Sequence, residues 1–478
     1  MRVLIAGTGS GSGKTTVTSG LVQCLVDRGL ATAAFKCGPD YIDPMFYERI
    51  TGARAGNLDP FFSDEKTLRW LVKKEEEKCD ISVIEGVMGY YDGIGFTSEA
   101  STFTVARAVK APVVLVINCR GMGASVGAVL KGFLDWPEIT DSGIKGVIFN
   151  NMSEKLYGRA AEMAEAMGVK PLGYLPRRAA LTLESRHLGL VTAAEVADIK
   201  EKMKLIASEM EKTVDIDGVI QLASQASELE TAEPEWKRRV VLGNGAARQS
   251  EPASPRGDAR IRIALASDDA FCFTYKENIA LLRELGCDII PFSPLCDGCL
   301  PDGTDGIILS GGYPELHAAE LAANEALLAA VRRSRDDGVP MIAECGGFMY
   351  LHETLEGADG KEYRMAGVVP GRCFRTDRLG RFGYVKLRAL KSGLLCPEGS
   401  ELKAHEFHYW DSEHCGEDFL AVKPDGSRSW NCGIMTDDMY AGFPHLFYYD
   451  SPEAAVRFVQ ACAGRRERLR RQSFDRLY

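Results

Sequence analysis

The chain begins with a short apolar stretch that leads into a glycine-rich run ending in a lysine. Residues 1–6 read Met-Arg-Val-Leu-Ile-Ala and have the composition of a buried β-strand. Residues 7–16 read Gly-Thr-Gly-Ser-Gly-Ser-Gly-Lys-Thr-Thr, and an apolar pattern with helical spacing follows. In a strand–loop–helix unit of this kind, backbone N–H groups of the loop and the helix N-terminus bind phosphate oxygens. The sequence therefore predicts a parallel α/β domain with a phosphate-binding loop.

Individual residues of this loop have expected roles. Lys14 should reach the outer phosphates of a bound nucleotide, and Thr15 or Thr16 should face Mg²⁺. The loop is longer than the common phosphate-binding loop, because its first glycine lies six residues before Gly13. This spacing resembles that of dethiobiotin synthetase and its relatives. The residues expected to bind ATP are Gly11, Ser12, Gly13, Lys14, Thr15, Thr16 and, at later strand ends, Asn150 and Pro176.

A cysteine between an apolar run and two glycines marks a second site. Residues 339–343 read as a buried strand, and Glu-Cys345-Gly346-Gly follows. This is the pattern of a nucleophile elbow, in which the reactive side chain stands at the end of a strand. Residues 306–315 read Gly-Ile-Ile-Leu-Ser-Gly-Gly-Tyr-Pro-Glu, which predicts a second strand ending in a glycine turn. The backbone N–H groups of Gly312 and Gly346 are therefore candidates to bind an oxyanion.

A histidine late in the chain is a candidate base for Cys345. His445 follows a Gly-Phe-Pro turn, which should place it on a loop at the end of a strand, and His405 and His408 are the alternatives. The cysteine elbow, the glycine turn and the histidine together resemble a class I glutamine amidotransferase, which cleaves glutamine to ammonia through a thioester. The resemblance implies that Cys345 and His445 are catalytic and that Gly312 and Gly346 lie in the glutamine pocket.

Composition limits the function classes. At 478 residues the chain should form two or three domains, and its net charge of −10 argues against nucleic acid as the main partner. No apolar stretch reaches the length of a membrane span, and no signal peptide is expected, so a cytoplasmic enzyme is predicted. The 14 cysteines are scattered and do not suggest a disulfide framework. The oligomeric state is left open, with a homodimer as one candidate.

Strands and helices should alternate through two α/β domains. Strands are expected at residues 3–6, 33–36, 81–85, 113–117 and 146–149, followed by polar helices over 195–230. This pattern predicts a doubly wound, mostly parallel sheet domain at residues 1–235. A stretch rich in turn-forming residues at 236–259 reads as a linker. A flavodoxin-like α/β domain of the amidotransferase type should span 260–462, with alternation throughout, and a basic tail 463–478.

Four carboxylates follow predicted strands of the first domain and should meet at one edge of its sheet. Glu85 ends an apolar strand, and Asp40, Asp43 and Asp92 lie in the loops after neighbouring strands. Ligands of open α/β sheets bind at the carboxyl ends of the strands. Mg²⁺ prefers one or two carboxylates together with phosphate oxygens. The expected metal ligands are Thr15, Asp43 and Glu85, and the residues expected to contact the substrate are Asp40, Tyr41, Ile42 and Asp92.

Six motifs in both domains resemble those of the cobyrinic acid a,c-diamide synthase family. They are Lys-x-Gly-Pro-Asp-Tyr-Ile-Asp-Pro from Lys36, Glu-Gly-Val-Met-Gly-x-Tyr-Asp-Gly from Glu85, Glu-Ser-Arg-His-Leu-Gly-Leu from Glu184, Ser-Gly-Gly-Tyr-Pro-Glu from Ser310, Ala-Glu-Cys-Gly-Gly from Ala343 and His-Glu-Phe-His-Tyr from His405. The resemblance covers about residues 1–460. It implies ATP- and glutamine-dependent amidation of the a and c acetate groups of a corrinoid through acyl phosphates, as part of cobalamin biosynthesis. The family assigns Asp40, Tyr41, Glu85 and Asp92 to the synthetase site.

The chain departs from related patterns at two places. Class I amidotransferases commonly have a glutamate two residues after the histidine, but Phe447 stands there, so the resemblance implies a Cys–His dyad. Arg178 replaces the aspartate or asparagine that usually follows Pro-Arg in the family. Three alternatives stay open: the same reaction on hydrogenobyrinic acid or nickel sirohydrochlorin, cobyric acid synthase, and a partitioning-type ATPase. The glycine-lysine-threonine loop disfavours the second, and the cysteine elbow disfavours the third.

Overall fold

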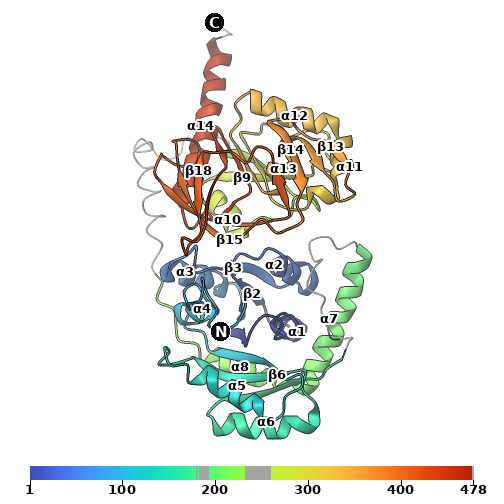
Figure 1. Ribbon diagram of the computed structural model, residues 1–478, viewed down its shortest axis with the longest axis vertical. Coiled ribbons are helices and arrows are strands. Elements are labelled where there is room, and N and C mark those ends of the chain that lie inside the picture. The colour runs from blue at the N-terminus through green and yellow to red at the C-terminus, as the bar shows by residue number, and fades with distance from the viewer. Residues whose placement is uncertain (179–180, 182–192, 232–259, 476–478) are drawn as a thin grey trace. The chain divides into compact units, whose positions relative to one another are not determined.

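The computed structural model describes residues 1–178, 181, 193–231 and 260–475 (Figure 1). The chain divides into two compact units, Met1–Pro234 and Glu235–Tyr478, and each has its own sheet and core. The expected linker at 236–259 and the motif that begins at Glu184 lie outside the described residues.

The N-terminal unit is built on seven parallel strands in the order β3-β2-β4-β1-β5-β6-β7. Their bounds are β1 Arg2–Gly7, β2 Thr32–Cys37, β3 Arg54–Leu58, β4 Ile81–Glu85, β5 Val113–Asn118, β6 Ile144–Asn150 and β7 Lys170–Leu175. The expected parallel α/β fold is confirmed, and all five expected strands are present. The two strands that were not expected, β3 and β7, form the edges of the sheet. Edge strands carry polar residues and glycine, so their apolar signal is weak.

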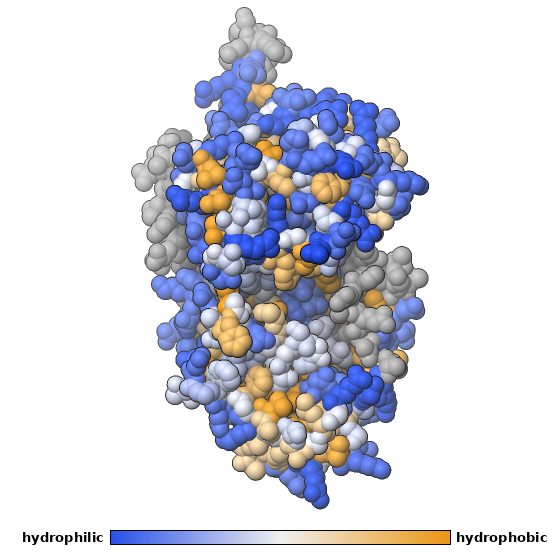
Figure 2. All heavy atoms as spheres, viewed as in Figure 1, coloured by the Kyte–Doolittle hydropathy of each residue, from blue (hydrophilic) through white to orange (hydrophobic). Residues whose placement is uncertain are grey.

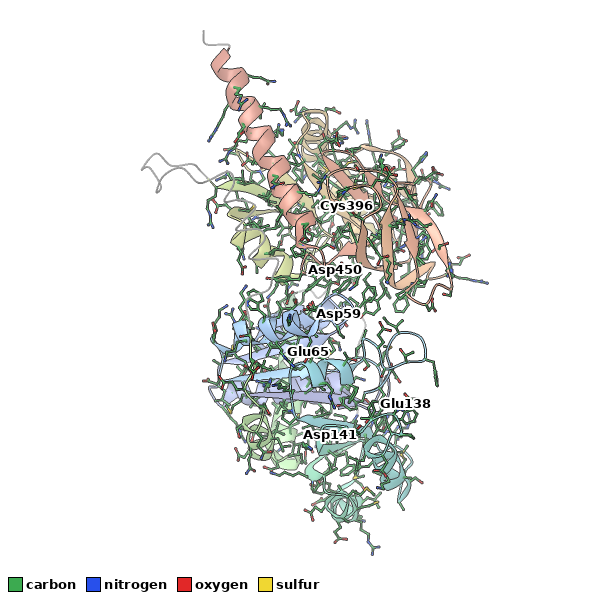
Figure 3. All side chains as sticks on the ribbon, turned by 90° about the vertical axis from the view of Figure 1, so that its left-hand side faces the viewer. Asp59, Glu65, Glu138, Asp141, Cys396 and Asp450 are labelled. Carbon is green, nitrogen blue, oxygen red and sulfur yellow. The ribbon has the colours of Figure 1, made fainter. Side chains whose placement is uncertain are left out.

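Helices cover both faces of this sheet (Figure 1). Helices α1 (Lys14–Asp27), α7 (Ala193–Thr213) and α8 (Ile216–Ser224) pack on one face through a shared apolar core. The remaining longer helices are α3 (Glu65–Glu76), α4 (Thr102–Ala108), α5 (Ser125–Leu134) and α6 (Glu154–Ala166). Between β2 and β3 the chain forms α2 (Ile42–Phe46) and the π-helix η1 (Tyr47–Thr51). Side chains occupy the space between the sheet and these helices (Figure 3).

The C-terminal unit has a central sheet of six strands in the order β20-β21-β11-β10-β8-β9. These strands are β8 Ile261–Ala266, β9 Cys287–Phe292, β10 Gly306–Leu309, β11 Met341–Glu344, β20 Ile434–Met435 and β21 Met439–Gly442. All pairs are parallel except β20 with β21. The described helices of this unit are α10 Lys276–Glu284, the 3₁₀ helix η3 Pro314–Leu316, α11 Ala318–Ala323, α12 Glu325–Asp336, α13 Gly346–Tyr350 and α14 Pro452–Asp475.

The expected alternation of strands and helices to residue 462 is wrong for the later part of this unit. From His352 to Leu446 the chain forms strands and no helix. Apart from β20 and β21, these strands make a four-stranded sheet in the order β13-β12-β14-β17 and a five-stranded sheet in the order β19-β18-β15-β16-β22. Their bounds are β12 His352–Glu356, β13 Glu362–Arg364, β14 Val369–Arg375, β15 Arg381–Ala389, β16 Glu401–His408, β17 Trp410–Ser412, β18 Phe419–Val422, β19 Ser429–Cys432 and β22 His445–Leu446.

The described helices can be compared with what a membrane-spanning helix requires. None of them combines the length and the apolar character that crossing a membrane requires. On the visible face of each unit, hydrophilic and hydrophobic residues are interspersed (Figure 2).

We expect the edge strand β7 of the first sheet to require a glycine at position 173 for stability. Gly173 has a φ of 124°, and a Cβ atom there would lie 2.2 Å from the carbonyl oxygen of Thr213. Gly173→Ala should therefore lower the free energy of unfolding by about 2–4 kcal/mol, because the contact is with backbone that cannot turn aside. Gly168→Ala is the matched control, since Gly168 also has a positive φ of 76° but open space around it. The control should cost about 1 kcal/mol. Urea unfolding of both variants measures this, and equal losses would show that the backbone contact does not matter.

Candidate active sites

The glycine-rich loop lies between β1 and α1 and is closed by contacts that only small residues permit. Gly13 precedes α1 with a φ of 97°, and a Cβ atom there would lie 2.0 Å from Asn150 Nδ2. The Asn150 side chain comes from the end of β6 and donates a hydrogen bond of 2.9 Å to the carbonyl oxygen of Ser12. The loop is thus pinned from a neighbouring strand, and its backbone N–H groups surround the start of the helix. This is the arrangement that binds phosphate oxygens.

Lys14, the first residue of α1, folds back over this loop. Its ammonium group donates to the carbonyl oxygen of Gly9 at 3.0 Å and to that of Met88, in the loop after β4. Burial, together with the nearby charge of Lys36, lowers the pKa of Lys14 to about 8. A buried cation whose hydrogen bonds go to carbonyl oxygens is well placed to bind an anion.

Glu85 lies at the centre of a buried polar cluster at the carboxyl edge of the sheet. The hydroxyl of Thr15 and the ammonium of Lys36 donate to its Oε1 at 2.6 and 2.8 Å, and the hydroxyl of Tyr47 donates to its Oε2. Lys36 also forms an ion pair of 2.6 Å with Asp43. Two carboxylates and a threonine hydroxyl therefore converge on one small region.

The charges within this cluster depend on each other. Burial alone disfavours the charge of Lys36, but Glu85 and Asp43 overcome it and raise its pKa. Burial likewise opposes ionisation of Glu85, yet Lys36 and the donated hydrogen bonds lower its pKa. The pKa of Asp43 rises to about 7, first through burial and then through the charge of Glu85. The cluster thus favours a cation between its two carboxylates.

The cluster includes two residues that were not expected in the site. Lys36 belongs to a motif recognised in the sequence, and a charged residue at the end of an apolar strand is a usable signal. Tyr47 gave no signal, because it looks like an ordinary core aromatic with no exposed surface.

The residues expected to contact the substrate lie at the same edge, where Ile42 begins α2 and the other three are in loops, and their observed contacts are local. Asp40 accepts hydrogen bonds from the backbone N–H groups of Ile42 and Asp43 at 2.8 and 3.4 Å. Asp92 is exposed and accepts from the N–H group of Gly89 at 2.7 Å. Tyr41 is buried beside Asp40. These carboxylates shape the loops around the phosphate-binding loop while keeping free oxygen lone pairs.

Among the residues expected to bind ATP, Pro176 follows the strand that is farthest from β1 in the sheet order. It follows β7 at the edge of the sheet, and β5 and β6 separate this strand from β1. Arg178, which departs from the family pattern, forms an ion pair of 3.0 Å with Glu209 of α7.

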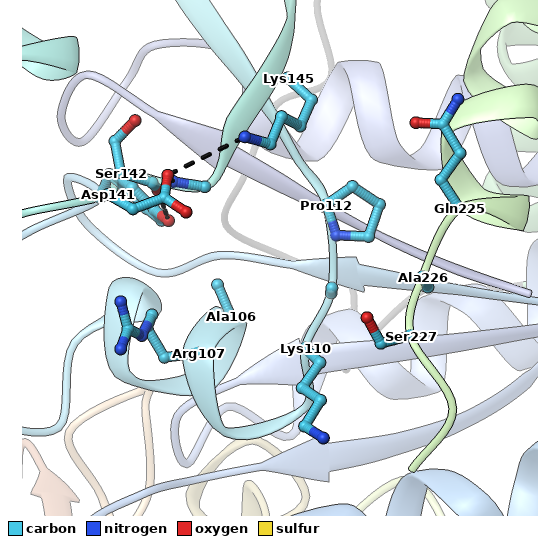
Figure 4. A pocket seen from close by; sticks show the side chains of 13 residues that line it. Ala106, Arg107, Lys110, Pro112, Asp141, Ser142, Lys145, Gln225, Ala226 and Ser227 are labelled. Carbon is cyan, nitrogen blue, oxygen red and sulfur yellow. Dashed lines mark hydrogen bonds and ion pairs between the residues drawn. The ribbon is translucent and has the colours of Figure 1, made fainter.

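A cavity of about 460 Å³ opens at the opposite, amino-terminal edge of this sheet (Figure 4). It is bordered by Arg107, Lys110 and Lys145, and the last of these pairs with Asp141 at 3.9 Å. The glycine-rich loop and Glu85 do not line it. Ligands of parallel sheets bind at the carboxyl edge, so this cavity is separate from the phosphate-binding site.

Cys345 of the C-terminal unit occupies a strained turn between β11 and α13. Its φ and ψ are 48° and −103°, a conformation that residues other than glycine rarely adopt. Its N–H group donates to the carbonyl oxygen of Gly442 at 2.8 Å, and its own carbonyl accepts from Met349 at 2.9 Å. Burial raises the pKa of the thiol, and Glu315 raises it further. The resting side chain is therefore a thiol that needs a base.

Two backbone N–H groups lie next to this turn. A Cβ atom on Gly346 would lie 3.0 Å from the backbone nitrogen of Gly312. Gly312 is itself tightly enclosed, because a Cβ atom there would lie 2.1 Å from the carbonyl oxygen of Ala270. The strand-end turn at Gly312 thus sits against the start of α13. This arrangement can hold a developing oxyanion beside Cys345.

His445 is buried next to the same glycine turn. A Cβ atom on Gly311 would lie 2.4 Å from its Cε1 atom, and its Nδ1 lies 3.8 Å from Oε2 of Glu344. Burial, together with the nearby His405 and His408, lowers the pKa of His445 to about 3. The expected position on a loop is wrong, since His445 begins β22 and pairs directly with His405. An antiparallel partner fixes its backbone more firmly than a loop would.

The two alternative histidines lie within β16. His408 stacks on Phe443 with ring centroids 3.9 Å apart, and its Nδ1 lies 2.5 Å from the carbonyl oxygen of Trp410. His405 pairs with His445 across the sheet and has its pKa lowered to about 4 by burial, with Lys423 contributing. The contact with Gly311 places His445 nearest to the glycine turn that adjoins Cys345.

The fold and the two sites define a nucleotide-binding domain joined to a glutamine amidotransferase domain. Residues 3–191 match the family model described as the CobQ/CobB/MinD/ParA nucleotide binding domain. Residues 262–449 match the model of the CobB/CobQ-like glutamine amidotransferase domain. The chain is thus built as a glutamine-dependent ligase.

Relatives that match along almost their whole length show which family of glutamine-dependent ligases this is. The cobyrinate a,c-diamide synthase of Caldanaerobacter subterraneus subsp. tengcongensis is 35% identical over 96% of this chain and 98% of its own. Those of Listeria innocua and Salmonella typhimurium are 36% and 37% identical over 96% of this chain, and over 99% and 97% of theirs. The chain belongs to the cobyrinate a,c-diamide synthase family.

Replacing each of the two histidines by asparagine tests which one is the base. His445→Asn should lower kcat for glutamine hydrolysis by about 100-fold or more, because asparagine cannot take the thiol proton. His405→Asn should reduce it by less than about tenfold, since His405 only borders His445. Steady-state glutaminase assays on both variants measure this. A larger loss in His405→Asn would transfer the role of base to that residue.

Proposed function

We propose that the protein amidates the a and c acetate carboxylates of cobyrinic acid, with ATP as co-substrate and glutamine as the source of nitrogen. The observation that carries this proposal is the presence, in one chain, of a phosphate-binding loop beside Glu85 and a cysteine elbow beside a glycine turn. The identity of 35–37% over 96% of the chain supports the choice of substrate.

The N-terminal unit would activate the carboxylate as an acyl phosphate. The loop from Gly11 to Gly13 would bind the phosphates through backbone N–H groups, with Lys14 reaching the outer ones. Lys14 would leave the carbonyl oxygens of Gly9 and Met88 and neutralise charge on the transferring phosphate. Ammonia would then displace phosphate from the activated carboxyl group. Asp40, Tyr41, Ile42 and Asp92 would position the corrinoid.

The cluster around Glu85 fits Mg²⁺. Asp43 and Glu85 both contact the ammonium of Lys36, at 2.6 and 2.8 Å, and the Thr15 hydroxyl reaches Glu85, so these oxygens already surround a positive charge. Among the described residues, no group of three or more His, Cys, Asp or Glu residues has the geometry of a metal site. Two carboxylates suffice, because Mg²⁺ takes its other ligands from phosphates and water. When bound, Mg²⁺ would neutralise phosphate charge, and Thr15, Asp43 and Glu85 would hold it.

The C-terminal unit would release ammonia from glutamine. Cys345 would attack the side-chain amide, and His445 would take the thiol proton and pass it to the departing nitrogen. The N–H groups of Gly312 and Gly346 would stabilise the oxyanion. Water would then hydrolyse the thioester to glutamate.

A panel of tetrapyrroles tests the substrate. The protein is incubated with ATP, Mg²⁺ and glutamine together with cobyrinic acid, hydrogenobyrinic acid or nickel sirohydrochlorin, and the products are weighed by mass spectrometry. Fastest diamide formation with cobyrinic acid is expected. Preference for either other tetrapyrrole would reassign the substrate and leave the chemistry intact. A rate of ATP hydrolysis that depends on none of the three tetrapyrroles would favour a partitioning-type ATPase.

Replacing the nucleophile should separate the two activities. Cys345→Ala should abolish glutamine-dependent amidation but keep amidation with ammonium chloride, because the phosphate-binding loop belongs to a different unit. Both rates are measured with the same corrinoid. Loss of the ammonia-dependent reaction in a variant that keeps the wild-type melting temperature would contradict two separable sites.

Replacing Glu85 should alter the dependence on Mg²⁺. Glu85→Gln should slow ATP-dependent amidation by orders of magnitude and raise the Mg²⁺ concentration needed, since metal charge stabilisation is worth roughly several kcal/mol. Tyr47→Phe is the control, because it removes a hydroxyl from the same carboxylate without changing charge. Asp92→Asn should keep ATP binding and slow turnover. Unchanged Mg²⁺ titrations in Glu85→Gln would exclude Glu85 as a ligand.

A further inference from the structure

A buried carboxylate lies immediately before the nucleophile and faces the proposed base. Glu344 ends β11, is 8% exposed, and has its Oε2 atom 3.8 Å from Nδ1 of His445. Its other oxygen accepts a hydrogen bond of 3.2 Å from the N–H group of Leu446. One side chain therefore lies against the ring of His445 and binds the backbone that follows it. Because Glu344 and Cys345 are neighbours in the chain, this contact also fixes the histidine relative to the thiol.

The position two residues after the histidine, where class I amidotransferases commonly carry a glutamate, holds an aromatic residue in this chain. Phe447, two residues after His445, is buried and packs on Tyr275 and Tyr449 with ring centroids 5.1 and 5.9 Å apart. The other buried glutamate–histidine pair of this unit, Glu406 with His408 at 3.7 Å, does not include His445. Among the described residues of this unit, Glu344 is the carboxylate that lies within ion-pair distance of His445.

We propose that Glu344 is the positioning residue that orients His445 and balances its charge while it carries the proton of Cys345. The proposal rests on the glutamine hydrolysis proposed above. The Cε1 edge of the ring points at Gly311, so Nδ1 and Nε2 lie on either side of it. With Nδ1–H directed to Glu344, Nε2 is the nitrogen that takes the proton when the S–H bond breaks. The proton then leaves with the amide nitrogen as ammonia, and His445 is neutral again.

The electrostatics of the pocket explain why such a partner is needed. Burial lowers the pKa of His445 to about 3 and raises that of Glu344 to about 8, so a single charge on either residue is unfavourable. An imidazolium beside a carboxylate offsets both costs. The other groups that face this site do not supply the compensation, since His405 and His408 repel a charge on His445. The charges of Glu315, Glu406 and Glu344 itself oppose a thiolate at Cys345, so Glu344 can assist the proton transfer only through the imidazolium of His445. Tyr440 and Tyr448 lie near Glu344 and stay neutral.

The test replaces Glu344 by glutamine, which keeps an oxygen for the Leu446 N–H group but removes the charge. Glu344→Gln should lower kcat for glutamine hydrolysis by about 100-fold with a smaller change in KM, and ammonia-dependent amidation should persist. The pH midpoint for alkylation of Cys345 by iodoacetamide, followed on its peptide by mass spectrometry, should rise by at least about one unit. Glu344→Asp, which restores the charge, should recover part of both losses.

Two comparisons make the result decisive. Glu320→Gln is the matched control, because it makes the same substitution in an exposed glutamate–histidine pair, with His317 at 2.7 Å, and should change neither readout. Alkylation and kcat in Glu344→Gln that match this control would overturn the proposal, as would a larger loss in Glu406→Gln. If Glu344→Gln does not fold, Glu344→Asp must still show an intermediate pH midpoint, and a wild-type midpoint would overturn the assignment. Absence of glutaminase activity in the wild-type protein would instead refute the proposed function.

Discussion

Glu85 carries a charge at a place where no water reaches it. It ends β4, a strand buried along its whole length, and has no exposed surface. A lone carboxylate in such a position would be strongly unfavourable, and removing one partner of a buried pair is correspondingly costly. The partners that stabilise it come from three other elements: Thr15 from α1, Lys36 from β2 and Tyr47 from η1. One buried charge therefore ties together the phosphate-binding loop, a neighbouring strand and the segment after it.

The second site depends on backbone geometry more than on charge. Cys345 is held at a positive φ because β11 is hydrogen-bonded into the central sheet and α13 begins directly after it. Gly312 approaches from β10 and His445 from β22, and neither could come so close if side chains larger than hydrogen stood at Gly311 and Gly346. Both sites lie at the carboxyl ends of central parallel strands, where neighbouring loops converge. The two halves of the proposed reaction thus use the same property of parallel sheets.

Sequence patterns predicted the parts of the protein that local rules govern. The strand–glycine–lysine unit, the cysteine elbow and the buried central strands each depend on a few consecutive residues, so the α/β fold could be inferred. The edge strands β3 and β7 were missed because polar residues and glycine interrupt their short apolar runs. The strands from His352 to Leu446 were missed because half-buried strands such as β15 and β16 alternate buried with more exposed positions and so form no continuous apolar run. Tyr47 and Glu344 were missed for another reason. Their contacts join residues 38 and 101 positions apart, which only the folded chain reveals.

Transfer of labelled nitrogen tests the joint action of the two sites most directly. The protein is given glutamine labelled with ¹⁵N in the side-chain amide, together with ATP, Mg²⁺ and cobyrinic acid, and the corrinoid is analysed by mass spectrometry while ADP is counted. The account predicts a diamide with two ¹⁵N atoms and one ADP for each amide formed. An unlabelled or unchanged corrinoid, or ADP production that does not depend on it, would contradict the account.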